Sequence, residues 1–277
     1  MLQETDDQPR GAPLGRRALG PLLGTLASLA LLGCAATELA EESAQEPTPA
    51  LAPPTELGNG VRAWGSMREA LRMGRSHARA VPVAEVSGLD IGVGALAELV
   101  GEVTIVDGRA YVSEGTGAAV GRTRPATAED RATLLVTARV SAWEEQALDP
   151  CRDLADLERQ LLAILTERGL DTTRPIPLRV RGRAAGLDLH VIAGDCPVAN
   201  PDGAPPWRHE AAGVDVELVG FLVEGAAGRL THHTGITHLH ALAGEVSGHL
   251  EDVSLEAGAT LMLPSSPELE VFSGEDE

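Results

Sequence analysis

The stretch THLHALAGEVSGHLEDVSL, residues 237–255, decides how this sequence is interpreted. Residues 237–242 and 248–255 predict two strands, and Ala-Gly-Glu at 243–245 predicts the turn that joins them. Because successive side chains of a strand point to opposite faces, the imidazoles of His238 and His240 lie on one face. His249 returns on the partner strand, close enough to complete a site of three nitrogens.

Three converging imidazoles predict a divalent metal ion, with zinc as the first choice. Catalytic zinc takes three protein ligands and keeps a position open for water or substrate. The alternative is a polar surface hairpin whose histidines make ordinary hydrogen bonds. A single His-x-His pair is weak evidence, but the third histidine on the partner strand favours the metal. His232 and His233 fall in a predicted loop and are expected to be solvated or to line a pocket.

Strands also dominate the sequence before this hairpin. They are predicted at 81–86, 91–99, 102–112, 133–140, 176–183, 187–192 and 214–223. Asp107-Gly108 predicts a hairpin turn inside 102–112. The clearest helix covers 153–168, where leucine and isoleucine recur at helical spacing and Gly169 follows. A short helix is expected after Ser66, which forms a capping box with Glu69. The predicted fold class is α+β: mostly β-sheets, barrel-like, with a few helices.

The composition is that of a globular protein and argues against nucleic acid as a partner. Hydrophobic residues make up 43% of the 277 residues, and this length suffices for one or two domains. The 22 basic and 41 acidic residues give a net charge of −19, which repels a phosphate backbone.

The first 33 residues predict a signal peptide of the lipoprotein type. Arg16 and Arg17 precede an apolar run that ends in Leu-Leu-Gly-Cys at 31–34. This ending resembles the lipobox of bacterial lipoproteins, so Cys34 is expected to carry a lipid that anchors an exported protein to the cell envelope. An uncleaved membrane anchor is the alternative, but the apolar run is short and contains glycine.

Residues 34–60 are acidic and rich in proline, which predicts a disordered linker. The folded, metal-binding part is expected at 61–277, with subdomains at about 61–150 and 151–277 as one way to divide it. In an oxidising compartment Cys151 and Cys196 have two options, a disulfide or two separate buried thiols, and the sequence favours neither.

Three stretches together resemble the bacterial α-acetolactate decarboxylase family. Residues 88–112, GLDIGVGALAELVGEVTIVDGRAYV, are similar to its glycine-rich stretch and to the hairpin ending in tyrosine. Residues 216–221, VELVGF, resemble the strand before the family's metal site. Residues 237–252 are similar to its His-x-His and Gly-Gly-His-Val-x-Asp signature. The likeness keeps the same order from about Arg62 to Leu263.

The resemblance implies a zinc-dependent lyase that converts 2-acetolactate to acetoin and CO2. It implies His238, His240 and His249 as zinc ligands, with Glu102 as a further ligand and a catalytic residue. The ion would chelate the oxygens of a 2-hydroxy-3-oxo acid and stabilise the enediolate, and a carboxylic acid would deliver the proton. Without the resemblance, Glu102 would be interpreted as an exposed hairpin residue. A homodimer is one option for the assembly.

Two parts of the family pattern are missing. The family binds the substrate carboxylate through an arginine in a strand, but this chain has no arginine between Arg183 and Arg208. His190 falls in that region and is predicted to be a substitute catalytic residue, with Arg181 or Arg183 as other candidates. The family's C-terminal catalytic glutamate has no good match either, because the chain ends in an acidic segment that is expected to be solvated.

Two other interpretations compete with the decarboxylase. A cupin would use His238, His240 and Glu245, but the second cupin motif is absent. A non-catalytic metal-binding lipoprotein would keep the metal ligands and tolerate the missing arginine.

Overall fold

The computed structural model describes residues 53–65, 81–86, 89–194, 202–231 and 235–265. The signal peptide, Cys34, Cys196, the helix predicted after Ser66, and the loop with His232 and His233 lie outside these ranges. In the described part, no helix is long and apolar enough to span a membrane.

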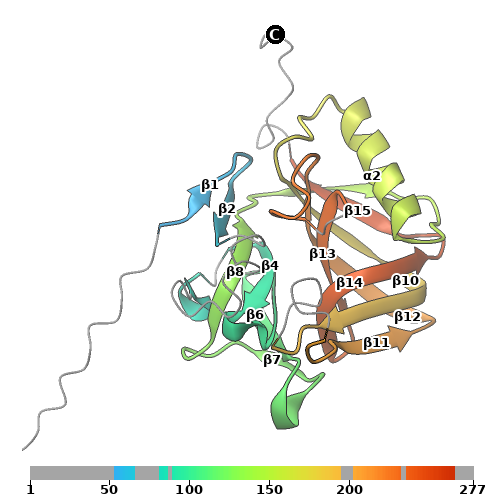
Figure 1. The fold of residues 1–277 in the computed structure, drawn as a ribbon. Helices are drawn as coiled ribbons and strands as arrows, with labels where there is room; N and C mark the ends of the chain where they lie inside the picture. Colours follow the sequence, from blue (N-terminus) through green and yellow to red (C-terminus); the bar gives the residue numbers. More distant parts are fainter. Residues whose placement is uncertain (1–52, 66–80, 87–88, 195–201, 232–234, 266–277) are drawn as a thin grey trace, which may run out of the picture. The chain divides into compact units, whose positions relative to one another are not determined.

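The first sheet has eight strands in the order β1-β2-β8-β4-β5-β6-β7, with β3 paired to β8 (Figure 1). The strands are β1 (Thr55–Glu56), β2 (Val61–Trp64), β3 (Val81–Pro82), β4 (Ile91–Leu96), β5 (Gly101–Val106), β6 (Arg109–Glu114), β7 (Thr123–Pro125) and β8 (Arg131–Ala138). β1 lies inside the predicted linker and pairs with β2, so the folded chain begins before Val61.

The predicted hairpin at 102–112 is confirmed as β5 and β6. Asp107 and Gly108 both have positive φ, 49° and 70°, as a two-residue hairpin turn requires. Two other predicted strands are shorter than expected. Val83–Glu85 and Ala97–Leu99 form 3-10 turns, η1 and η2, and Glu98 and Leu99 adopt positive φ, which ends the extended strand at Leu96.

The second sheet has seven strands in the order β12-β13-β14-β10-β15-β9, with β11 on β10. Its strands are β9 (Trp143–Ala147), β10 (Ile176–Val191), β11 (Trp207–Ala211), β12 (Val214–Leu222), β13 (Thr237–Ala243), β14 (Val246–Leu255) and β15 (Thr260–Pro264). β12 also pairs with β10, so β12, β13, β14 and β10 close into a small barrel.

The strands predicted at 176–183 and 187–192 are one strand, β10. Its pairing with β14 shifts register between Ala184 and Gly186, which marks a bulge. The break predicted between the two strands is wrong, because a bulge absorbs the irregularity and the strand continues.

Helix α2 (Leu154–Glu167) confirms the predicted helix. Asp153 caps it by accepting the N–H of Asp156 at 2.7 Å, and Gly169 follows its end with φ of 69°. Leu157, Leu161 and Leu165 are fully buried in the core cluster that holds the inward-facing residues of the barrel strands. The helix therefore covers one face of the second sheet.

The opposite face of the second sheet packs against the first sheet. Ile91 and Val93 of β4 share a buried cluster with Val219 and Phe221 of β12. The α+β fold, mostly strands with a small barrel, is therefore as predicted. The histidines of β13 and β14 and Glu102 of β5 lie in this layer between the sheets.

Candidate metal centre

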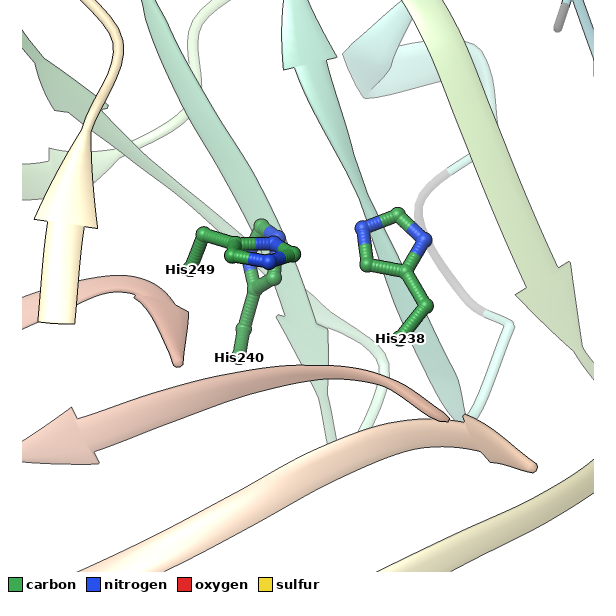
Figure 2. A group of neighbouring side chains, drawn as sticks. All are labelled: His238, His240 and His249. Atoms are coloured by element: carbon green, nitrogen blue, oxygen red, sulfur yellow. The ribbon is translucent and has the colours of Figure 1, made fainter. Parts of the chain in front are cut away.

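The three predicted ligands come together from two neighbouring strands. His238 and His240 lie on β13 and His249 lies on β14, where it is the backbone partner of His240. One ring nitrogen from each of the three lies within 4.8 Å of the others, so the group could hold a metal ion. Figure 2 shows the three imidazoles gathered on one side of these strands.

The histidines are buried in an apolar layer. His240 is fully inaccessible to solvent and His238 is 3% exposed. On the neighbouring strand β12, Phe221 pairs with His238 and Val219 pairs with His240. Buried polar nitrogens need a partner of their own, whether a hydrogen-bonding group or a metal ion.

Glu102 approaches this group from the other sheet. Its side chain on β5 is buried, and the Ile192 N–H donates to its Oε1 at 3.4 Å. Oε2 lies 3.8 Å from Nε2 of His240, and Oε1 lies 3.8 Å from Nε2 of His190. Both distances are too long for hydrogen bonds. Atoms that bind one zinc ion at about 2.0–2.2 Å lie roughly 3–4 Å apart, so the spacing fits a shared ion.

Thr104 fixes the orientation of His240. A hydrogen bond of 2.9 Å joins Thr104 Oγ1 to His240 Nδ1, which turns Nε2 toward Glu102. Among the described residues, the buried Nε2 has no hydrogen-bond partner. Thr104 was not predicted as a site residue. Strand alternation held the signal, because Thr104 is two residues from Glu102 and so lies on the same face of β5.

Burial shifts the pKa values of both kinds of group. It lowers the pKa of His240 well below its ordinary value, and the charges of His238 and His190 add to the effect. Burial raises the pKa of Glu102 well above its usual range, and the Ile192 N–H opposes this only in part. His240 is therefore neutral, which is the form that binds metal, and a cation next to Glu102 would offset the unfavourable burial of its carboxylate.

His190 lies at the edge of the same group. It is the backbone partner of His249 across β10 and β14, and the centroids of the two rings are 4.9 Å apart. Its Nδ1–H donates to Glu251 Oε1 at 2.6 Å. His190 was predicted near the site, but Glu251 was not, although it follows His249 by two residues on the same face of β14.

Comparison with known proteins gives a likeness in structure alone. No protein-family model matches the chain, and no curated protein matches it significantly. The α-acetolactate decarboxylase of Bacillus subtilis strain 168 is 19% identical, with a TM-score of 0.57 over 73% of this chain and 84% of that one. The acetolactate decarboxylase of Bacillus subtilis subspecies spizizenii is 17% identical, with a TM-score of 0.58 over 76% of this chain and 94% of that one. The fold is that of acetolactate decarboxylase.

A third structure has the same fold and no assigned function. It is a Staphylococcus aureus protein described as similar to α-acetolactate decarboxylase, 14% identical, with a TM-score of 0.57 over 74% of this chain and 85% of that one. The TM-scores establish the acetolactate-decarboxylase fold, and identities this low leave the chemistry to be argued from the site.

Arg181 and Arg183, the other candidates for the missing carboxylate-binding arginine, make hydrogen bonds away from the histidine group. Arg181 donates to Glu217 at 3.1 Å and Arg183 donates to Asp215 at 3.3 Å. Both arginines lie on β10, as His190 does, but the bulge at residues 184–186 separates them from it. Of the predicted candidates, His190 is therefore the one that the structure brings to the histidine group.

A pocket of about 360 Å³ opens beside His249. Its walls come from the first turns of α2, the first residues of β13 and the middle of β14, and they include Leu154, Glu158, Leu239 and Glu251. His249 is part of the lining, so the pocket adjoins the histidine group at that residue.

Two other predicted residues lie away from the site. Glu245, which a cupin would use as a ligand, is exposed in the turn between β13 and β14. The carboxylate near His240 belongs to Glu102 and not to Glu245. The structure therefore gives the cupin interpretation no support. Cys151 is a buried free thiol whose Sγ lies 3.9 Å from the Val253 carbonyl oxygen, and burial raises its pKa. Cys196 lies outside the described residues, so the disulfide stays a prediction.

Proposed function

We propose that this chain is a metal-dependent lyase that converts 2-acetolactate, or a closely related 2-hydroxy-3-oxo acid, to acetoin and CO2. The observation that carries the proposal is the group of His238, His240 and His249 in an acetolactate-decarboxylase fold, with a Glu102 carboxylate oxygen 3.8 Å from His240 Nε2. Zinc is the proposed ion because neutral imidazoles and one carboxylate are ligands that it prefers.

The donor set fits such an ion. His240 offers a buried Nε2 that lacks a hydrogen-bond partner within the described part of the chain, and Thr104 holds the other nitrogen. This arrangement is typical of metal-binding histidines, whose second nitrogen is fixed by a neighbouring polar group. When bound, the ion would act as a Lewis acid and draw electrons from the oxygens of the substrate.

The residues of the chain would supply the remaining steps. The pocket beside His249 is the proposed entry for the substrate. After CO2 leaves, the carbon that carried it needs a proton. Glu102 is the candidate to return one, because its Oε1 lies 3.8 Å from Nε2 of His190 at the edge of the site.

The activity is expected to be weaker than that of an enzyme with an arginine at the substrate carboxylate. Losing a charge-assisted hydrogen bond removes about 1.5–3 kcal/mol. This corresponds to a decrease of roughly ten- to a hundredfold in affinity or rate.

The decisive experiment measures acetoin from 2-acetolactate with zinc-loaded protein. The wild type should exceed the spontaneous rate, while a Glu102→Ala, His240→Ala double variant should not. His209→Ala is the matched control, because His209 lies on β11 and stacks on Trp207, with ring centroids 5.7 Å apart. This control should keep the activity of the wild type.

A second candidate is a non-catalytic metal-binding protein. The missing arginine favours it, because metal binding does not need a carboxylate anchor. If the wild type binds zinc and yet matches the spontaneous rate, this candidate replaces the lyase.

We also propose that the protein is exported and anchored by a lipid on Cys34. The apolar run ending in Leu-Leu-Gly-Cys supports this. Mass spectrometry of the mature protein should find acylated Cys34 at its N-terminus. An exported protein that keeps residues 1–33 and an unmodified Cys34 would contradict it.

A further inference from the structure

We infer that His190 is an additional imidazole ligand of the same metal centre and that Glu251 positions it. This inference rests on the metal site of the proposed function. It gives His190 a different role from that of a substitute for a carboxylate-binding arginine. The metal site would then contain four histidines and Glu102.

His190 and His240 stand in equivalent positions on either side of Glu102. Each turns its Nε2 toward a different oxygen of that carboxylate, and each of the two distances is 3.8 Å. Each also has its Nδ1 held by a polar side chain, Thr104 for His240 and Glu251 for His190. The distance to Glu102 and the held Nδ1, two of the reasons for treating His240 as a ligand, therefore recur at His190.

Glu251 determines which nitrogen of His190 is available. A carboxylate accepts the Nδ1–H at 2.6 Å, which leaves Nε2 facing the site. Carboxylate–histidine pairs of this kind orient metal ligands in many proteins and raise the basicity of the ligand nitrogen. Arg208 stands 3.6 Å from the other oxygen of Glu251 and 2.7 Å from Asp188, so the carboxylate is itself held in place.

The backbone places His190 next to His249, one of the three histidines of the metal site. His190 pairs with His249, and a methyl group built at Gly248 would lie 2.5 Å from the His190 carbonyl oxygen. β14 therefore approaches β10 closely at this point. This approach makes the rings of His190 and His249 neighbours, with centroids 4.9 Å apart.

The test is cobalt binding, measured by competition with a chelator and by the visible absorption spectrum of the bound Co²⁺. His190→Ala and His190→Gln should weaken Co²⁺ binding at least tenfold and change the spectrum. Glu251→Gln should weaken binding about tenfold, at the lower end of the range for residues that orient ligands. His209→Ala and Glu210→Gln, on strand β11, are matched controls and should bind Co²⁺ like the wild type. Circular dichroism should show that every variant is folded.

The outcomes separate this inference from the proposed function. If the His190 variants bind Co²⁺ with the affinity and spectrum of the wild type, the inference is wrong. A higher KM for acetolactate in those variants would then assign His190 to the substrate. If the wild type binds Co²⁺ with the expected dependence on His190 but forms no acetoin, the inference stands and the lyase fails. Equal binding by the wild type and by His240→Ala would overturn the whole metal centre.

Discussion

The Nε2 atom of His240 lies 3.8 Å from Oε2 of Glu102, although the two residues belong to different sheets. An ion bound by both would join β13 of the second sheet to β5 of the first. Metal binding should therefore stabilise the packing of the two sheets as well as prepare the site for chemistry.

Replacing His240 by Ala should abolish this stabilisation. A ligand at a hundred times its Kd adds about 2.7 kcal/mol to the free energy of unfolding. For a domain of this size that corresponds to an increase in Tm of roughly 5–10 °C. Zinc should raise the Tm of the wild type and of His209→Ala by this amount and leave that of His240→Ala unchanged. An equal rise in His240→Ala would show that zinc binds elsewhere.

Replacing Glu102 by Gln should have opposite effects with and without metal. The metal-free wild type buries a carboxyl group whose pKa is raised by desolvation, so its ionised form is unfavourable at neutral pH. Glutamine removes that penalty and should make the metal-free protein at least as stable as the wild type in urea denaturation. The same change should reduce the stabilisation that zinc provides.

The exposed Glu245 in the hairpin turn offers a control for this change. Glu245→Gln should alter neither the metal-free stability nor the effect of zinc. A large loss of stability in metal-free Glu102→Gln would show that the carboxyl group makes a structural contact that glutamine cannot replace.

The local parts of the site were predictable from the sequence, and the contacts between sheets were not. His238, His240 and His249 share one hairpin, so strand alternation and one turn suffice to bring them together. Glu102 is more than a hundred residues away and entered only through the family resemblance, because no periodicity reports which strands of two sheets face each other. Thr104 and Glu251 were missed although each lies two residues from a named site residue.

The fold class was predictable for a similar reason. Apolar strands such as β12 have a clear pattern, and so does the leucine spacing of α2. β9 and β11, with sequences WEEQA and WRHEA, were missed because they are short and largely polar. Such strands form because a neighbouring strand offers hydrogen bonds, here β15 and β10. Their own sequence does not show that partner.

The ion pair between Asp130 and Arg124 should make stability depend on pH in the acid range. Arg124 donates to both oxygens of Asp130 at 2.8 and 2.9 Å, and this contact holds the pKa of Asp130 below its ordinary value. A lowered carboxyl pKa stabilises the fold above the unfolded pKa of about 3.9, and this contribution is lost as the pH falls through the folded pKa. The loss should therefore occur below about pH 4.

Urea denaturation of Asp130→Asn at two pH values checks this prediction. The variant should be less stable than the wild type by about 1 kcal/mol at pH 6, since the pair is partly exposed. The difference should shrink at pH 3. Asp202→Asn, at an exposed position, is the control. A difference that stays constant between the two pH values would mean that the pair does not titrate with folding.

Replacing Gly248 by Ala should damage the metal centre without touching a ligand. The added methyl group would lie 2.5 Å from the His190 carbonyl oxygen and 2.9 Å from Leu189 Cδ1, so β14 must move away from β10. That movement separates His190 from His249. We therefore expect a loss of stability of about 1–3 kcal/mol, as for other overpacked sites, together with weaker zinc binding.

Gly244→Ala is the control. Its φ of 62° is strained for alanine, by about 1–2 kcal/mol, but nothing lies within 4 Å of the new methyl group. Gly244→Ala should therefore lose stability while it keeps the zinc affinity of the wild type. If Gly248→Ala also binds zinc like the wild type, the close approach of β14 to β10 does not position the ligands, and side-chain contacts such as Thr104 with His240 must do so alone.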